Sequence, residues 1–185
     1  KVYGLIGFPL GHSFSKKYFT EKFETQGISD CEYQLFELES IDQLSDMLRR
    51  ETNLKGFNIT IPYKEQIFPY LDQLGPHAAE IGAVNVVNIV DGKLIGYNSD
   101  YIGFSDTLKK FIDQKAVKNA LILGTGGASK AIAYALKQLN INYQYVSRKS
   151  GDGLISYNEL KQNNAIKNFQ LIINTTPLGT YPNPE

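Results

Sequence analysis

A glycine turn between an apolar strand and an alanine-rich helix is the feature that most restricts how this chain can fold. Residues 120–123 (ALIL) predict a buried strand, the turn GTGG follows at 124–127, and residues 128–139 predict a helix. A second strand at 143–146 completes a β–α–β unit. Such units form parallel sheets. Glycines at this turn let the backbone approach the pyrophosphate of a dinucleotide at the N-terminus of the helix.

The end of the second strand indicates which dinucleotide is bound. An NAD enzyme is expected to place an acid there for the ribose 2′-hydroxyl, but this chain has Ser147-Arg148-Lys149. Two cations favour NADP, because a guanidinium binds a phosphate through paired hydrogen bonds. Two alternatives stay open. The glycine pattern departs from GxGxxG, so it can be a plain strand-to-helix turn, and the two bases can be solvated residues of an exposed turn.

The first hundred residues also alternate strands with helices. Helices are predicted after Ser15, with Gly27 as a left-handed end, and after a capping box of Ser40 and Gln43. The pair Asp91-Gly92 predicts a two-residue hairpin that closes this half with one antiparallel pair. Strands are predicted at residues 2–7, 32–35, 56–61, 83–90 and 93–97.

We therefore predict an α/β fold with two domains. Residues 1–100 form an α/β domain with a mixed, mostly parallel sheet, and residues 101–185 form a partial Rossmann-like domain that begins with a helix at 101–113. The last predicted strand, at 170–174, is followed by no closing helix, so we expect the nucleotide domain to be incomplete at its C-terminus.

Composition narrows the class of partner. Lysine plus arginine and aspartate plus glutamate number 19 each, so no net charge attracts nucleic acid or an anionic membrane, and we expect a small-molecule partner. No apolar run approaches the length of a membrane span. Cys31 is the only cysteine, which excludes an internal disulfide and a cysteine-based metal cluster; we expect no metal and a reducing cytoplasm.

Three polar clusters are candidate site residues. Ser13 and Ser15 stand at a helix start, where two hydroxyls and the helix dipole could hold a carboxylate, although Ser15 could simply cap the helix. Lys64 follows the strand that carries Asn58 and Thr60. A lysine that is partly desolvated in a crevice can act as an acid or base, but most lysines are solvated surface residues.

The third cluster combines an amide with a carboxylate. Asn85 is predicted to lie inside an apolar strand, where its amide needs a partner, either a backbone group or a substrate hydroxyl. Asp100 lies at a strand-to-helix junction. It could cap the helix, or it could hold a neighbouring lysine charged and oriented.

Five motifs in this order resemble the shikimate dehydrogenase family, from Val2 to Gly179. They are HSFS at 12–15, NITIPYK at 58–64, GAVNV at 82–86, NSDYIGF at 98–104 and GTGGA at 124–128. The resemblance implies an NADP-dependent oxidoreductase that reduces 3-dehydroshikimate to shikimate in aromatic amino-acid biosynthesis, and a monomer or homodimer. It also implies that further nucleotide domain and a substrate-contacting glutamine follow in family members.

The resemblance also implies roles for individual residues. Lys64 is the catalytic acid or base, supported by Asp100. The substrate carboxylate and hydroxyls contact Ser13, Ser15, Thr60, Lys64, Asn85 and Asp100. The cofactor lies against Gly124, Gly126, Gly127, Ala128, Ser147, Arg148 and Lys149.

The chain also departs from the family pattern, at Lys16, Val86, Ser99, Tyr101 and residues 147–149. Val86 and Tyr101 could reshape the pocket, which makes a related dehydrogenase acting on quinate or an amino-shikimate analogue the main alternative. A catalytically silent nucleotide sensor is a second alternative, which the pairing of Lys64 with Asp100 disfavours. The balanced charge and the lack of repeats do nothing to support a structural module.

Overall fold

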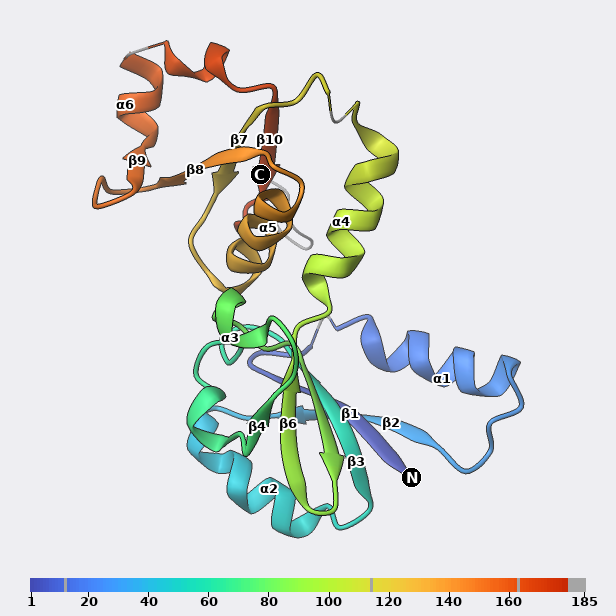
Figure 1. Cartoon of the computed structure of the whole chain (residues 1–185). Helices are drawn as coiled ribbons and strands as arrows, with labels where there is room; N and C mark the ends of the chain where they lie inside the picture. The colour runs from blue at the N-terminus through green and yellow to red at the C-terminus, as the bar shows by residue number, and fades with distance from the viewer. Residues whose placement is uncertain (12, 114, 163, 180–185) are drawn as a thin grey trace. The chain divides into compact units, whose positions relative to one another are not determined.

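The computed structural model describes residues 1–11, 13–113, 115–162 and 164–179. The chain divides into two compact units, Lys1–Ser99 and Asp100–Glu185 (Figure 1). Each unit has its own sheet, so the predicted α/β class is confirmed. Among the described residues, no helix is both long and apolar enough to cross a membrane.

The first unit is built on a six-stranded sheet in the order β2-β1-β3-β5-β6-β4. Strand β1 is parallel to β2 and β3, the pairs β3–β5 and β5–β6 are antiparallel, and β4 is parallel to β6. The strands are β1 (Val2–Gly7), β2 (Glu32–Glu37), β3 (Leu54–Ile59), β4 (Gln73–Leu74), β5 (Val86–Val90) and β6 (Lys93–Tyr97).

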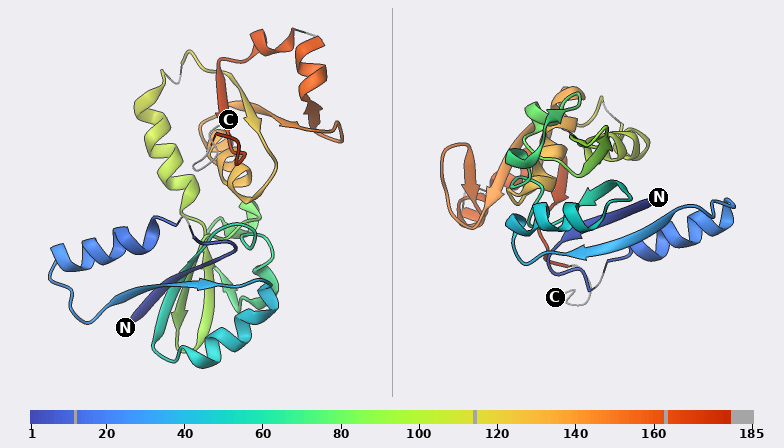
Figure 2. Two further views of the ribbon diagram at one scale, coloured as in Figure 1. Left: turned by 180° about the vertical axis from the view of Figure 1, so that it is seen from behind. Right: turned by 90° about the horizontal axis from the view of Figure 1, so that it is seen from below.

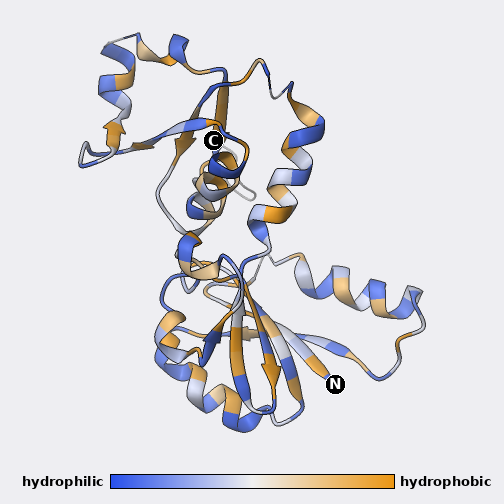
Figure 3. Cartoon of the chain, in the orientation of Figure 1, coloured by the Kyte–Doolittle hydropathy of each residue, from blue (hydrophilic) through white to orange (hydrophobic). Residues whose placement is uncertain are grey.

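One face of this sheet carries the main core of the first unit. Its most deeply buried side chains include Ile6, Leu44 and Ile67, which come from β1, from helix α2 (Leu44–Arg50) and from the turn after β3. In Figure 3, α2 carries hydrophobic and hydrophilic residues around its axis, and Leu44 and Met47 are its buried pair. The predicted capping box is confirmed, because Ser40 and Gln43 bond reciprocally at the start of the short helix η1 (Ile41–Gln43) that leads into α2.

Helix α1 (Ser15–Thr25) lies beside β2 at the edge of the sheet (Figure 2). It packs there through Phe19 and Phe23, against a small cluster centred on Leu5 and Tyr33. The helix ends where the sequence predicts. Gly27 has a φ of +66°, and the amides of residues 27 and 28 bond back to the carbonyls of residues 24 and 23, as in a Schellman end.

The β5–β6 hairpin confirms one prediction and corrects another. Asp91 and Gly92 both have positive φ and join Val90 to Lys93, as the Asp-Gly pair predicts. The predicted strand at 83–90, however, begins only at Val86. Asn85 therefore lies just before a strand rather than inside one, although its backbone still bonds to both neighbouring chain segments.

The second unit has a parallel sheet in the order β10-β7-β8-β9. Numbered along this unit, the order is 4-1-2-3, which read in the other direction is the 3-2-1-4 part of the Rossmann order 3-2-1-4-5-6. The strands are β7 (Asn119–Leu123), β8 (Asn142–Ser147), β9 (Leu154–Ser156) and β10 (Leu171–Asn174). The sequence predicted β7, β8 and β10 to within one residue, but not the short β9.

Alternation along β7 divides the second unit into two layers. Ala120 and Ile122 face helices α4 (Asp100–Phe111) and α5 (Gly127–Gln138), while Leu121 and Leu123 face α6 (Tyr157–Gln162) and η3 (Ala165–Asn168). Both faces of the sheet are covered, which is why β7 is a continuous apolar run. The remaining short elements, α3 (Ala78–Ile81) and η2 (Phe68–Tyr70), belong to the first unit.

Candidate active site

One edge of the first sheet gathers the ends of four strands. The amide of Thr60 donates to the carbonyl of Ile6 (2.9 Å), and the amide of Ile59 donates to that of Asn85 (2.9 Å). The amide of Asn85 in turn donates to the carbonyl of Tyr97 (3.0 Å). The sequence-predicted residues Thr60 and Asn85 therefore lie just outside the strands, where β1, β3 and β6 end and β5 begins.

Ser13 and Ser15 lie at the beginning of α1, but Ser15 does not cap it. The residue in the cap position is Phe14, and among the described residues no side chain accepts a capping bond there. Instead, the Ser13 hydroxyl accepts a bond from the Ser15 amide (3.3 Å). The capping alternative for Ser15 is wrong, because Phe14 holds the cap position and no described side chain makes a capping bond.

Tyr33, on β2, connects α1 to β3. Its hydroxyl donates to Oδ1 of Asn58 at 2.8 Å. Its ring stacks on Phe19 of α1 with the centroids 4.5 Å apart and an interplanar angle of 13°. Burial raises the pKa of Tyr33 to about 12, and the hydrogen bond from Ser15 opposes that rise. Sequence reasoning found only the strand period at Tyr33, and no local pattern indicates its two partners.

Asn85 is held by the segment that leads out of the first unit. Its Oδ1 accepts from the Ser99 amide (2.7 Å), and its Nδ2 donates to the Ser99 hydroxyl (3.0 Å). Beside it, the buried Asn98 donates to the carbonyl of Ala83 (2.9 Å). The side-chain oxygen of Asn85 thus has a backbone partner, the Ser99 amide, which is one of the two alternatives predicted from the sequence. The Ser99 hydroxyl is a further partner that the sequence did not indicate.

Lys64 lies in a tight turn that follows β3. The turn is anchored by Tyr63, which is 2% exposed and donates its hydroxyl to the carbonyl of Leu38 (2.5 Å), and by the fully buried Ile67. The carbonyl of Lys64 accepts the amide of Val84 (2.8 Å), which ties the turn to the residues before β5. Lys64 itself is half-buried. Its backbone position is thus set by flanking buried residues.

Asp100 is the first residue of α4 and belongs to the second unit, directly after Ser99 in the chain. The next residue, Tyr101, packs its ring against Tyr134 of α5 in an edge-to-face contact of 5.1 Å. Tyr101, where the family pattern has glycine, therefore contributes to the packing of α4 on α5.

The glycines of the turn after β7 differ in the reason for which glycine is needed. Gly124 has a φ of +105°, and a Cβ there would lie 2.9 Å from the Thr175 hydroxyl oxygen, so the protein itself requires glycine. Gly126 has an ordinary extended backbone, and a Cβ there would meet no described atom within 4 Å. A side chain at Gly126 would instead occupy open space in front of α5. Without a side chain at this position, the backbone can approach a pyrophosphate closely.

The start of α5 is also suited to an anion. Gly126 is the N-cap residue of α5, and no described side chain caps the helix. The first turn, which begins with Gly127 and Ala128, contains no acidic residue. The orphan N–H groups and the positive end of the helix dipole therefore face the open space at Gly126. These residues fit a dinucleotide phosphate.

The cations of the second strand lie on an exposed turn. Ser147 is the last residue of β8, and Arg148 and Lys149 follow it at the surface. The turn is tied to the start of α6, because the Ser150 hydroxyl donates to the Glu159 carboxylate (2.7 Å). That bond, together with the amide and hydroxyl of Ser156, lowers the pKa of Glu159 to about 2.

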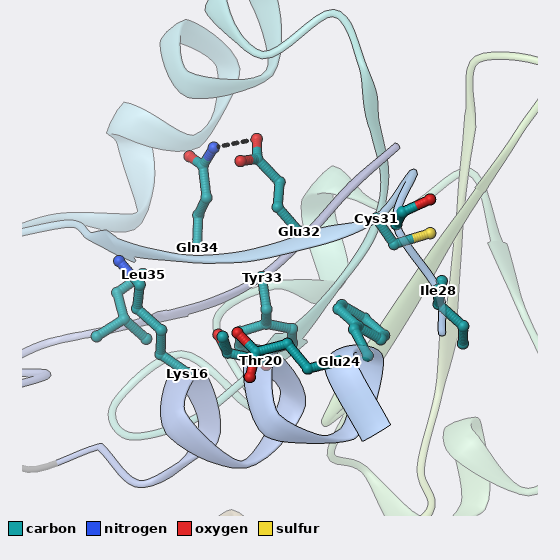
Figure 4. Close-up of a pocket in the computed structure, with 11 residues that line it drawn as sticks. Lys16, Thr20, Glu24, Ile28, Cys31, Glu32, Tyr33, Gln34 and Leu35 are labelled. Carbon is teal, nitrogen blue, oxygen red and sulfur yellow. Dashed lines mark hydrogen bonds between the residues drawn. The ribbon is translucent and has the colours of Figure 1, made fainter. Parts of the chain in front are cut away.

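A separate hollow of about 590 Å³ lies between α1 and β2 (Figure 4). Its lining includes Lys16, Glu24, Cys31 and Tyr33, and only Tyr33 has a hydroxyl that also reaches Asn58. None of the residues predicted from sequence to bind substrate or cofactor lines this hollow. It is thus distinct from the polar cluster at the strand ends.

The second unit has the strand order, glycine turn and uncapped helix start of a dinucleotide-binding α/β domain. A first unit with polar side chains at its strand ends precedes it. Comparisons with known proteins agree with this class. Residues 5–87 match the model of the shikimate dehydrogenase substrate binding domain. An NADP(+) shikimate dehydrogenase from Methanosphaera stadtmanae is 38% identical, over all of this chain and 70% of the relative.

Solved structures give the same result. The crystal structure of shikimate dehydrogenase 1 from Peptoclostridium difficile superposes with a TM-score of 0.87 at 38% identity, over 99% of this chain and 70% of that one. The Thermus thermophilus enzyme in complex with NADP(H) and shikimate gives 0.81 at 29% identity, over 99% and 73%. The chain belongs to the shikimate dehydrogenase family. The prediction of an NADP-dependent oxidoreductase of this family is confirmed by these relatives.

Proposed function

We propose that this chain reduces 3-dehydroshikimate to shikimate with NADPH, in a reversible hydride transfer. The observation that carries the proposal is the gathering of Asn58, Thr60 and Asn85 at the strand ends of the first unit, beside the turn that carries Lys64. Hydroxyls and amides at this edge match a small, hydroxyl-rich acid. Relatives solved with shikimate and NADP(H) support the same pair of ligands.

The two units have separate tasks in this proposal. Residues 1–100 bind substrate, with Ser13 and Ser15 at its carboxylate and Thr60, Asn85 and Asp100 at its hydroxyls. Residues 101–185 bind NADP. The backbone at Gly124, Gly126, Gly127 and Ala128 holds the pyrophosphate, and Ser147, Arg148 and Lys149 contact the 2′-phosphate of the adenosine.

The reduction requires a proton at the substrate oxygen as well as the hydride that NADPH supplies when bound. Lys64 donates that proton to the oxygen as negative charge develops there, because an ammonium group is a competent acid. Asp100 keeps the lysine charged and oriented. In the oxidation of shikimate, the same lysine accepts the proton.

An absorbance assay of nicotinamide reduction tests the proposal. The full-length protein is mixed with one substrate, shikimate or quinate, and one cofactor, NADP⁺ or NAD⁺, in all four combinations. We expect the highest kcat/KM with shikimate and NADP⁺. A higher value with quinate would reassign the substrate, and no reduction with any pair would overturn the proposed activity. A cytoplasmic location and a monomeric or homodimeric state remain predictions from the sequence.

A further inference from the structure

Tyr33 contacts two elements that the proposed function assigns to substrate binding. Its ring stacks on Phe19 of α1, and its hydroxyl donates a hydrogen bond to Asn58 at the end of β3 (2.8 Å). Tyr33 itself is 4% exposed, which is too little for it to bind substrate. It therefore supports Asn58 from behind the site.

The direction of this hydrogen bond follows from the chemistry of the two groups. A tyrosine hydroxyl has one hydrogen to donate, and Tyr33 donates it to the amide oxygen of Asn58. Burial keeps the pKa of Tyr33 near 12, so Tyr33 stays protonated and a donor at neutral pH.

This direction determines which end of the Asn58 amide faces outward. The oxygen is turned toward Tyr33, so the amino group points away from it. Within the described part of the chain, no buried side-chain nitrogen or oxygen lacks a hydrogen-bond partner, and the Asn58 amino group makes no bond there. That amino group is therefore not buried. It can donate to an oxygen of a bound molecule.

Packing limits the movement of Tyr33. Its ring stacks on Phe19, and Leu5 and Leu10 belong to the same cluster. A rigid ring delivers its hydroxyl to one place, which removes rotational freedom from Asn58 before a ligand arrives. Preorganisation of this kind strengthens binding because less entropy is lost on association.

We propose that Tyr33 is a positioning residue of the substrate site, which turns the amino group of Asn58 at the end of β3 outward, toward a bound molecule. The inference rests on the proposed function, since shikimate is the ligand whose binding it improves. Tyr33 acts through the Asn58 side chain and does not contact substrate itself.

The test replaces Tyr33 with phenylalanine in the full-length protein, which keeps the stacked ring and removes only the hydroxyl. We expect the KM for shikimate to rise about tenfold while the KM for NADP⁺ and the kcat stay within twofold. Tyr70→Phe is the matched control, because it also removes a hydrogen-bonded hydroxyl, which donates to Asp42 at 2.8 Å. That variant should leave both KM values unchanged.

Two further variants separate positioning from packing. In an Asn58→Ala background, Tyr33→Phe should raise the KM for shikimate much less than it does in the unmodified protein, because groups that act as a unit are not additive. Phe19→Leu keeps the tyrosine hydroxyl and weakens the stack, and it should lower thermal stability with a smaller change in KM. An unchanged KM in Tyr33→Phe, an equal rise in both backgrounds, or an equal rise in Phe19→Leu would overturn the inference. Failure of the unmodified protein to oxidise shikimate would instead contradict the proposed function.

Discussion

Lys64 and Asp100 are the residues on which the proposed proton transfer depends. The two residues lie in different kinds of local structure. Lys64 lies on a turn anchored by the buried Tyr63 and Ile67, whereas Asp100 is the first residue of a helix. A proton donor must hold one position relative to the substrate oxygen, and an anchored turn after a strand meets that requirement better than a surface loop does.

At the residue scale, Lys64→Ala is expected to lower kcat by about 10²–10⁴, the usual contribution of a positioned acid or base. Asp100→Asn should cost less, and the double variant should be little worse than Lys64→Ala alone. Steady-state kinetics across pH would check this, and the kcat profile should lose a limb without the lysine. Lys55→Ala, which removes an exposed lysine from β3 itself, is the control. A folded Lys64→Ala protein with near-normal kcat would contradict the mechanism.

Arg148 supports a separate prediction about the cofactor. Arg148→Ala should weaken NADPH binding by about 1.5–3 kcal/mol, the scale of a hydrogen bond to a charged group, and leave NADH binding nearly unchanged. Titration calorimetry with both cofactors measures the difference. Lys167→Ala removes an exposed cation of the same unit from η3 and should affect neither. Equal losses for NADPH and NADH would mean that Arg148 does not contact the 2′-phosphate.

At the element scale, the turn between β7 and α5 combines two different demands for glycine. Gly124 is required by the fold, since its φ is +105° and Thr175 approaches it closely. Gly126 is not required by any described neighbour, and in the proposed function the bound cofactor is the reason for glycine there. One turn therefore serves both the strand order of the sheet and the proposed cofactor.

The two glycines should respond oppositely to alanine. Gly124→Ala is expected to destabilise the protein by about 1–3 kcal/mol, the cost of a strained backbone conformation. Gly126→Ala should leave stability unchanged and weaken NADP⁺ binding at least tenfold, because its methyl group occupies the open space before the helix. Thermal unfolding and NADP⁺ titration of both variants would check this. The reverse pattern, with Gly126→Ala unstable and Gly124→Ala binding poorly, would contradict it.

The hydrogen bonds of Glu159, in α6, make the stability of the folded protein depend on pH. The pKa of this carboxyl falls from an ordinary 4.5 to about 2 in the folded protein, because the Ser150 hydroxyl and the amide and hydroxyl of Ser156 donate to it. A lowered folded pKa adds stability above the unfolded value, and that contribution is lost as pH falls from 4.5 through 2.

Glu159→Gln should therefore lower the free energy of unfolding at pH 7, and the difference from the unmodified protein should shrink as pH decreases toward 2. Urea denaturation at several pH values between 7 and 2.5, followed by circular dichroism, measures it. Parallel curves for the two proteins across that range would show that Glu159 contributes nothing through its ionisation.

At the scale of the whole molecule, the proposed division of labour between residues 1–100 and 101–185 can be measured directly. Shikimate should slow amide hydrogen exchange in the segments around residues 13–16, 57–64 and 83–86. NADP⁺ alone should slow exchange around residues 124–130 and 147–149, since ligands protect the amides of the elements they contact. Protection by NADP⁺ confined to the first unit would contradict the assignment.

Local chemistry explains what could be predicted from the sequence. The β–α–β unit at 120–146, the capping box at Ser40, the left-handed Gly27 and the Asp91-Gly92 hairpin each depend on neighbouring residues, so a short window contains the whole interaction. The motif order similarly indicated the family, which the comparisons confirm. His12, at the start of the first motif, lies outside the described residues.

Only the tertiary structure decided which distant residues meet. Tyr33 and Asn58 lie on different strands, Asn85 finds Ser99 only because β5 and β6 fold back as a hairpin, and Gly124 meets Thr175 because β10 pairs with β7. Alternation along β2 indicates that Tyr33 is buried, but not what its hydroxyl contacts. The sequence by itself determined most of the longer elements and the family, because propensity, capping and turn chemistry act over a few residues. The contacts that hold the site's side chains depend on strand order and register, which no local pattern contains.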